Sequence, residues 1–239
     1  MEAPRRFHWV WAVCLLAIAA APRPLLAETI DDVGVWTALF SNGELNLFQE
    51  EEESPWRWWF DGQVRFFDDF DGFGQTLVRP GIGYQLDEKL KLWAGYAWIH
   101  TDPAAGAFDE HRSWQQLTWT HKLEPATFDL RSRLEQRFLE TGDDTGWRFR
   151  QLFALRRPFE AAPRYTLVAW DEAFFHLNDT DWGAEAGFDQ NRAFLGFGWK
   201  RCPESTWRVE LGYLHQFINR SGVPDISNHL LSVNFFWSP

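Results

Sequence analysis

Arginine and acidic side chains recur at every second position along several stretches of this chain. In the clearest stretch they stand at Arg131, Arg133, Glu135 and Arg137. Guanidinium groups in fixed positions bind carboxylates and phosphates through paired hydrogen bonds, so such rows are typical of a path or site for acidic solutes. They also suit a structural plug, in which buried charges neutralise one another. The candidates are Arg57, Arg65, Arg79, Glu110, Arg112, Arg131, Arg133, Glu135, Arg137, Arg148, Arg150, Arg192, Arg208 and Glu210, with Asp61, Gln63, Gln116, Glu172, Gln190 and Gln216 beside them.

A second pattern bears on catalysis. His111 and Ser113 stand two residues apart and would share one face of a strand, with Asp109 one step further. A lipid-modifying hydrolase of the outer membrane needs a nucleophile, a base and an orienting acid near the lipid interface. The spacing is not diagnostic, and the chain has no Gly-x-Ser-x-Gly motif. We therefore expect a non-enzymatic protein and assign no catalytic residue.

Acidic turns raise the question of metal binding. The run at 68–71 places three aspartates before Gly72, but it lacks the glutamate that closes a calcium loop. The histidines show no metal-site spacing. We expect neither a metal nor a cofactor.

The elements that carry these side chains are predicted to be strands with unlike faces. In 56–67, Trp56, Trp58, Phe60 and Val64 alternate with polar residues such as Arg65. Alternation with period two is the signature of a strand whose two faces meet different surroundings. The strands in 56–86 run to about a dozen residues, whereas a tilted strand needs about 9–11 to cross a bilayer. The pattern therefore predicts an antiparallel transmembrane β-barrel with an apolar outside and a polar, arginine-rich lumen.

The alternative is a secreted soluble sandwich or lipocalin-like barrel, with its apolar side facing inward. Alternation alone does not say which face points in. Strand length and a polar face bearing both charge signs favour the membrane barrel.

Ten strands are predicted from Trp56 onward. After the pair in 56–86 they cover 89–101, 110–121, 127–138, 147–156, 165–176, 188–199, 206–217 and 228–237. Longer connections rich in Gly, Asp and Asn alternate with shorter ones, as in outer-membrane barrels. A hairpin at 33–48, turning at Ser41-Asn42-Gly43, would bring the count to about twelve. We expect an even count, because an eleventh strand alone would leave the N-terminus on the wrong side.

Tryptophan is abundant, with 16 residues in the chain. One predicted girdle lies at the periplasmic strand ends and the other, with Trp98 and Trp147, at the outer ends, as membrane interfaces select. The periplasmic set is Trp36, Trp56, Trp119, Trp199, Trp207 and Trp237.

The first 27 residues are predicted to be a cleaved secretory signal peptide. They carry Arg5 and Arg6, an apolar core over 7–21 and a short segment ending at Ala27. Residues 28–239 then form one barrel domain, which keeps only Cys202 and so has no internal disulfide. The formal net charge of −11 argues against nucleic acid as a partner.

Seven ordered motifs resemble a bacterial family named only as a domain of unknown function, number 2490. The resemblance spans about 33–237 and implies an outer-membrane β-barrel of Gram-negative bacteria, without activity, substrate or site residues. Its motifs are 79–84 (RPGIGY), 93–99 (WAGYAWI), 110–116 (EHRSWQQ), 133–138 (RLEQRF), 170–175 (WDEAFF), 189–192 (DQNR) and 211–216 (LGYLHQ).

Together these features predict a porin-like protein of the bacterial outer membrane, either a structural barrel or a narrow channel. The alternatives are a selective channel for acidic solutes or oligosaccharides, and a lipid-modifying hydrolase. The expected partners are outer-membrane lipid and lipopolysaccharide, the barrel assembly machinery during biogenesis, and a small acidic solute.

Overall fold

The computed structural model describes residues 29–46, 54–67, 72–103 and 106–239. The predicted signal peptide and the acidic run at 68–71 lie outside the described residues. The described part is all-β and contains eleven strands. They are β1 (Thr29–Glu44), β2 (Trp56–Phe67), β3 (Gly72–Gln85), β4 (Leu90–Thr101), β5 (Phe108–Leu123), β6 (Ala126–Leu139), β7 (Thr145–Phe159), β8 (Ala162–His176), β9 (Gly187–Trp199), β10 (Trp207–Ile218) and β11 (Asp225–Trp237).

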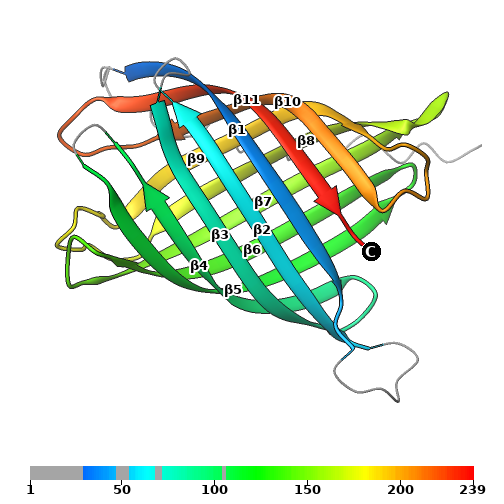
Figure 1. The fold of residues 1–239 in the computed structure, drawn as a ribbon, viewed down its shortest axis with the longest axis horizontal. Coiled ribbons are helices and arrows are strands. Elements are labelled where there is room, and N and C mark those ends of the chain that lie inside the picture. Colours follow the sequence, from blue (N-terminus) through cyan, green and yellow to red (C-terminus); the bar gives the residue numbers. More distant parts are fainter. Residues whose placement is uncertain (1–28, 47–53, 68–71, 104–105) are drawn as a thin grey trace, which may run out of the picture.

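The strands form one closed barrel in which each strand from β1 to β11 pairs with the next along the chain, and β11 pairs back with β1 (Figure 1). All consecutive pairs are antiparallel. The predicted fold class, an antiparallel barrel with a polar arginine-rich interior, is confirmed. The end of the barrel that carries the connections 102–107, 140–144, 177–186 and 219–224 is termed the loop rim, and the opposite end the turn rim.

The prediction of a hairpin at 33–48 is wrong. β1 is one continuous strand, and its residues from Val35 to Glu44 pair antiparallel with β2. The Ser41-Asn42-Gly43 sequence stays extended because both of its edges have partners: Ser41 pairs with Phe60, and its hydroxyl donates to the Trp237 carbonyl at 2.9 Å. Local turn propensity is overridden by this pairing.

The barrel closes with an odd number of strands, so the expectation of an even count is also wrong. β1 and β11 run parallel, in register from Thr29 with Asp225 to Ser41 with Trp237. A parallel seam lets eleven strands close, and it places the start of β1 at the loop rim. An odd number of strands also occurs in the mitochondrial barrel with 19 strands.

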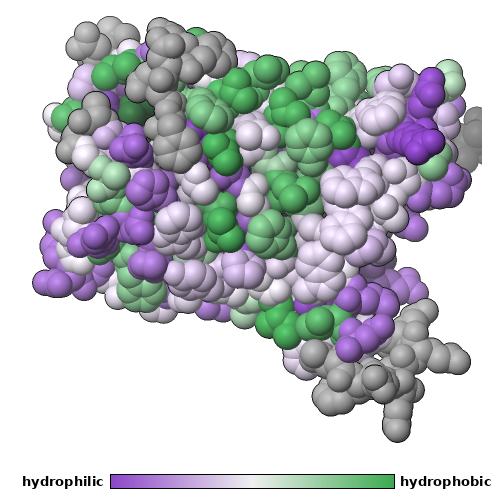
Figure 2. Space-filling model, viewed as in Figure 1, coloured by the Kyte–Doolittle hydropathy of each residue, from purple (hydrophilic) through white to green (hydrophobic). Residues whose placement is uncertain are grey.

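Large apolar side chains cover the outside of the barrel. Leu195, Leu211 and Leu231, on neighbouring strands, are 50–59% exposed. In Figure 2 apolar residues gather over the middle of the visible face, and hydrophilic residues lie toward both ends. The soluble sandwich, which would bury these residues, is thereby excluded as the fold.

One tryptophan of the predicted girdles faces the other way. Trp36 is buried inside the barrel, in a cluster with Phe194, Leu214 and Leu230. Trp207 and Trp237 do lie outside at the turn rim, stacked with ring centroids 5.8 Å apart. The prediction treated all tryptophans alike, although the alternation in β1 puts Trp36 on the inner face.

Several outward polar side chains lie among the apolar ones and bond to each other. The amides of Gln115 and Gln136 exchange hydrogen bonds of 3.0 and 3.1 Å, and the Asn191 amide donates to the Asp171 carboxylate at 3.0 Å. Pairing within the sheet lowers the cost of exposing these groups to an apolar medium. No helix in the part of the chain that the structure describes is long and apolar enough to cross a membrane.

Candidate functional site in the arginine-rich interior

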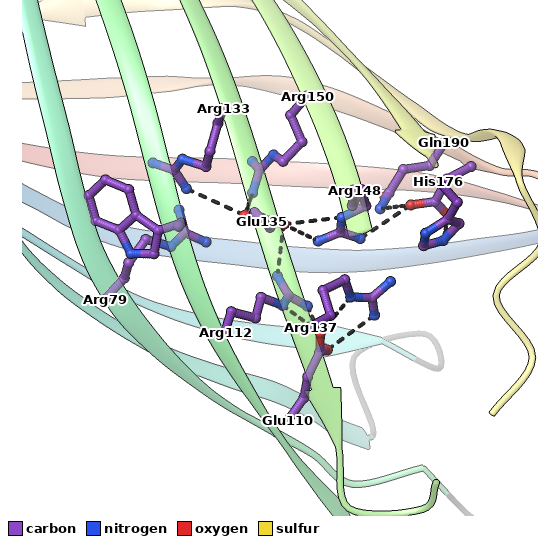
Figure 3. Close-up of polar contacts among 12 residues, drawn as sticks. Arg79, Glu110, Arg112, Arg133, Glu135, Arg137, Arg148, Arg150, His176 and Gln190 are labelled. Carbon is purple, nitrogen blue, oxygen red and sulfur yellow. Dashed lines mark hydrogen bonds and ion pairs between the residues drawn. The ribbon is translucent and has the colours of Figure 1, made fainter. Parts of the chain in front are cut away.

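Glu135 on β6 is the centre of the interior cluster. Its carboxylate is fully buried and accepts hydrogen bonds of 2.6 Å from Arg148 and 2.6 Å from Arg150, both on β7 (Figure 3). The guanidinium groups of Arg112 and Arg133 stand 3.7 Å away. Register explains the convergence, because Glu135 pairs directly with Arg148 across β6 and β7. One carboxylate thus stabilises four cations inside the barrel.

A second carboxylate, Glu110 on β5, binds two arginines nearer the loop rim. Both oxygens of Glu110 accept from Arg112 at 2.6 Å, a two-pronged pair. Arg137 donates to the same oxygens at 2.5 and 3.2 Å. Arg112 therefore links the Glu110 and Glu135 groups into one network.

Three further acids complete the network. Glu172 accepts from Arg150 at 3.0 Å and from Arg131 at 2.9 Å. The Arg79 guanidinium lies 3.1 Å from the Asp61 carboxylate, and the Arg148 guanidinium lies 3.2 Å from the Asp189 carboxylate. The pairing leaves arginine in excess. Five acids, Asp61, Glu110, Glu135, Glu172 and Asp189, face nine arginines, Arg65, Arg79, Arg112, Arg131, Arg133, Arg137, Arg148, Arg150 and Arg192.

Within this excess of four, Arg65 and Arg192 are the two arginines of the network without a carboxylate partner among the described residues. Arg65 donates to the amide oxygens of Gln63 and Gln75, and to no carboxylate in the part of the chain that the structure describes. Among the described residues, none accepts a hydrogen bond from Arg192, whose side chain is 92% buried and whose Nε is inaccessible to water. Buried cations without counter-ions are costly, so these two guanidinium groups stand out.

Aromatic rings hold the planes of these arginines. The Arg65 and Arg192 guanidinium carbons lie 3.6 and 4.6 Å from the centre of the Trp36 ring. Phe174, also fully buried, has Arg192 at 4.5 Å and Arg150 at 4.4 Å from its ring centre. Cation–π contacts of this kind supply part of the stabilisation that the absent carboxylates would give.

Two glycines make room for the indole ring of Trp114 inside the barrel. Trp114 is fully buried and lies against Gly95, its cross-strand partner on β4, and against Gly81, the partner of Gly95 on β3. A Cβ on Gly95 would stand 2.3 Å from the Pro80 carbonyl oxygen and 2.5 Å from the Trp114 ring. The glycines make room for an indole to lie flat on the inner wall, where Arg133 covers it at 4.7 Å.

Two cavities meet at the network inside the barrel. The loop-side cavity, of about 240 Å³, and the turn-side cavity, of about 390 Å³, share Arg79, Arg150 and Arg192 in their linings. These three arginines therefore lie where the two cavities meet, and this point is termed the constriction.

Three of the predicted candidates lie away from the central network. Arg57 on β2 pairs with Glu44 at 2.7 Å, and Arg208 with Glu210 at 2.9 Å on β10. Arg208 and Glu210 line the turn-side cavity. The other predicted arginines and acids all belong to the central network.

Sequence reasoning missed Asp189, Trp36 and Phe174 as members of the site. By alternation along β9, Asp189 should face outward. The register with β8 shifts by one residue at this point, because Phe174 pairs with Gln190 and Phe175 pairs with Phe188. This bulge turns the Asp189 carboxylate inward toward Arg148. Trp36 and Phe174 could have been found, because each stands at an alternate position of its strand that faces the interior.

The predicted hydrolase residues do not form a nucleophile–base pair. The Ser113 hydroxyl donates to Gln136 at 2.6 Å, whereas the His111 ring bonds to the Tyr96 hydroxyl. Asp109 bonds to His100 at 2.6 Å instead. Among the described residues, no group of three or more His, Cys, Asp or Glu side chains is arranged to hold a metal ion.

A docked loop lies over one side of the loop rim. Both oxygens of the Asp181 carboxylate accept backbone hydrogen bonds, from Asp143 N–H at 2.9 Å and from Asp144 N–H at 3.2 Å. The Trp182 indole N–H donates to the Asp144 carbonyl at 2.8 Å. The guanidinium carbon of Arg137 lies 5.0 Å from the centre of the Trp182 ring. The loop 177–186 is thereby fixed against 140–144.

This contact predicts a pH dependence. The N–H groups of Asp143 and Asp144 hold the pKa of the Asp181 carboxyl below its ordinary value of 3.8. A lowered pKa in the folded state means that the contact is fully present above pH 3.8 and is lost only as pH falls through the lower value. We expect slow hydrogen exchange at the Asp143 and Asp144 amides to persist below pH 3.8.

Asp181→Ala should speed exchange at these two amides even at pH 7, as measured by mass spectrometry. Asp102→Ala, in another connection at the same rim, is the control and should leave them unchanged. Equal exchange in the wild type and Asp181→Ala would contradict the docking.

Comparison with known proteins agrees with the sequence motifs. The family described as Protein of unknown function (DUF2490) matches residues 33–227. An uncharacterized protein of Methylorubrum extorquens is 33% identical over 235 residues, covering 94% of each chain. Among solved structures, the outer-membrane expressed OmpT of Vibrio cholerae gives a TM-score of 0.39 at 14% identity, covering 75% of this chain and 61% of that chain. The resemblance that the seven motifs predicted is confirmed.

Proposed function

This chain belongs to the family of proteins of unknown function DUF2490, and from that premise we propose that it is an outer-membrane β-barrel that passes small anions through its arginine-rich interior. In this proposal a cleaved signal peptide directs it across the inner membrane, and the assembly machinery inserts it. Its outer surface then contacts lipid and lipopolysaccharide.

The exterior supports the membrane location. A closed barrel has no unpaired edge, which is the condition for a sheet to lie in lipid. Its strands of 12–16 residues exceed the length needed to cross a bilayer. Exposed apolar side chains such as Phe197, at 58%, would be costly in water but are favourable against hydrocarbon.

The unpaired arginines carry the anion proposal. A network that served only to fill the barrel would pair its charges, yet Arg192 stands without a carboxylate partner in the constriction between the two cavities. A positive surplus in a narrow, low-dielectric passage concentrates anions and repels cations.

Conductance in planar bilayers tests the proposal. We expect the purified wild type to give small, discrete steps with reversal potentials that show anion preference. Arg192→Glu should reduce that preference about tenfold at low salt, because it places a negative charge in the constriction. Arg157→Glu is the control: Arg157 is 60% exposed near the turn rim and should leave selectivity unchanged.

A second candidate is a closed structural barrel. The fourfold coordination of Glu135 favours it, because so many strong ion pairs across the lumen resist opening. A folded, inserted protein that shows no conductance would establish this candidate and overturn the first.

A further inference from the structure

We infer that the loop-side cavity is a binding site for a phosphate group, held by Arg192 and Arg65. The inference rests on the proposed function in that the ligand is one of the anions admitted to the interior. It goes further in naming the ligand chemistry and the residues that hold it.

The wall of the loop-side cavity is positively charged and so favours an anion. Seven arginines and two acids line the cavity, so its wall carries a formal surplus of five positive charges. Over the whole central network, nine arginines face five acids, which leaves a surplus of four positive charges. Two of these guanidinium groups, those of Arg65 and Arg192, have no carboxylate partner among the described residues and match a doubly charged ligand.

The unsatisfied hydrogen-bond donors of Arg192 and Arg65 also indicate an anionic ligand. No hydrogen bond joins the Arg192 guanidinium to an acceptor among the described residues, and its Nε is fully buried without a partner. Arg65 lies in the same wall, with its Nε buried and without a partner. Buried donors are nearly always satisfied in folded proteins, so an acceptor that enters the cavity is expected.

Geometry favours phosphate over carboxylate. Trp36 contacts both guanidinium groups, so their planes are held before a ligand arrives. A phosphate offers three or more acceptor oxygens around a tetrahedral centre and so can take donors from both arginines at once. A carboxylate has two oxygens in one plane and a single charge.

The size of the cavity limits the ligand. A volume of about 240 Å³ is equivalent to about eight water molecules. It is below the range of about 300–1,000 Å³ that drug-sized ligands occupy. This volume suits inorganic phosphate or a small phosphate monoester better than an acidic oligosaccharide.

Equilibrium binding to the full mature barrel in detergent tests the inference. The probes are radiolabelled inorganic phosphate, glucose 6-phosphate and, as a carboxylate of similar size, glucuronate. We expect saturable binding of about one phosphate per barrel, competition by glucose 6-phosphate, and at least roughly tenfold weaker competition by glucuronate.

Arg192→Gln and Arg65→Gln should each weaken phosphate binding about 10- to 100-fold, the effect of losing charge-assisted hydrogen bonds. Arg208→Gln is the matched control, because it removes an interior arginine that lines only the turn-side cavity. Heat-modifiable migration in electrophoresis establishes that each variant is folded.

Three results would overturn the inference: no saturable binding by the wild type, glucuronate binding as tightly as phosphate, or equal losses in Arg208→Gln and Arg192→Gln. A barrel that conducts anions without binding phosphate refutes this inference alone. One that binds phosphate without conducting refutes only the proposed passage.

Discussion

Glu135→Gln is expected to lower the free energy of unfolding by about 3–5 kcal/mol, the cost of breaking a buried ion pair by removing one partner. The substitution keeps the shape of the side chain but removes the charge that Arg148 and Arg150 contact at 2.6 Å. It also leaves Arg112 and Arg133 without their common counter-ion. Denaturant titration of the barrel in lipid vesicles, followed by tryptophan fluorescence, measures the change.

Two controls separate this effect from a general loss of acid. Glu160 is 81% exposed in a turn, and Glu160→Gln should change stability by less than about 0.5 kcal/mol. The double variant Glu135→Gln with Arg148→Gln should recover part of the loss, because it removes one of the uncompensated cations. If Glu135→Gln were as stable as the wild type, Glu135 would not be the centre of the network.

Trp114→Ala is expected to cost about 3–5 kcal/mol, the range for deleting a large buried aromatic side chain. Trp114 is fully buried, and its indole N–H donates to the Tyr96 carbonyl at 3.1 Å. Its removal leaves a hollow above Gly81 and Gly95, neither of which has a side chain to fill it. It also takes away the ring that Arg133 covers.

Trp207→Ala provides the comparison, since Trp207 is 49% exposed at the turn rim. The same denaturant titration should show a loss well below that of Trp114→Ala. Trp114→Phe should retain most of the stability, because a smaller ring still covers the glycines. Equal losses at positions 114 and 207 would show that the interior tryptophan has no special packing role.

The faces of the strands could be predicted because they depend only on local alternation. Arg133, Glu135 and Arg150 were assigned inward from period two alone, and the structure places all three in one network. Asp189 could not be found in this way, since the bulge that turns it inward arises from the pairing of β8 with β9. Alternation carries no information about such slips of register.

The seam could not be predicted for a related reason. Ser41-Asn42-Gly43 has the composition of a turn, and the sequence near it contains nothing to indicate a partner almost two hundred residues away. That partner, β11, holds the segment extended through the Ser41–Trp237 contact. The unpaired state of Arg192 was equally invisible, because it depends on which carboxylates other strands bring within reach.

The shared direction of the first and last strands restricts how this chain can be rearranged. Residues 29 and 237 emerge at opposite mouths of the cylinder, separated by the length of a strand, on the order of 40 Å. In a barrel surrounded by lipid, as proposed above, a peptide bridge between these ends would have to run through the bore, because hydrocarbon excludes irregular backbone. The bridge would then occupy the very space in which the guanidinium groups converge.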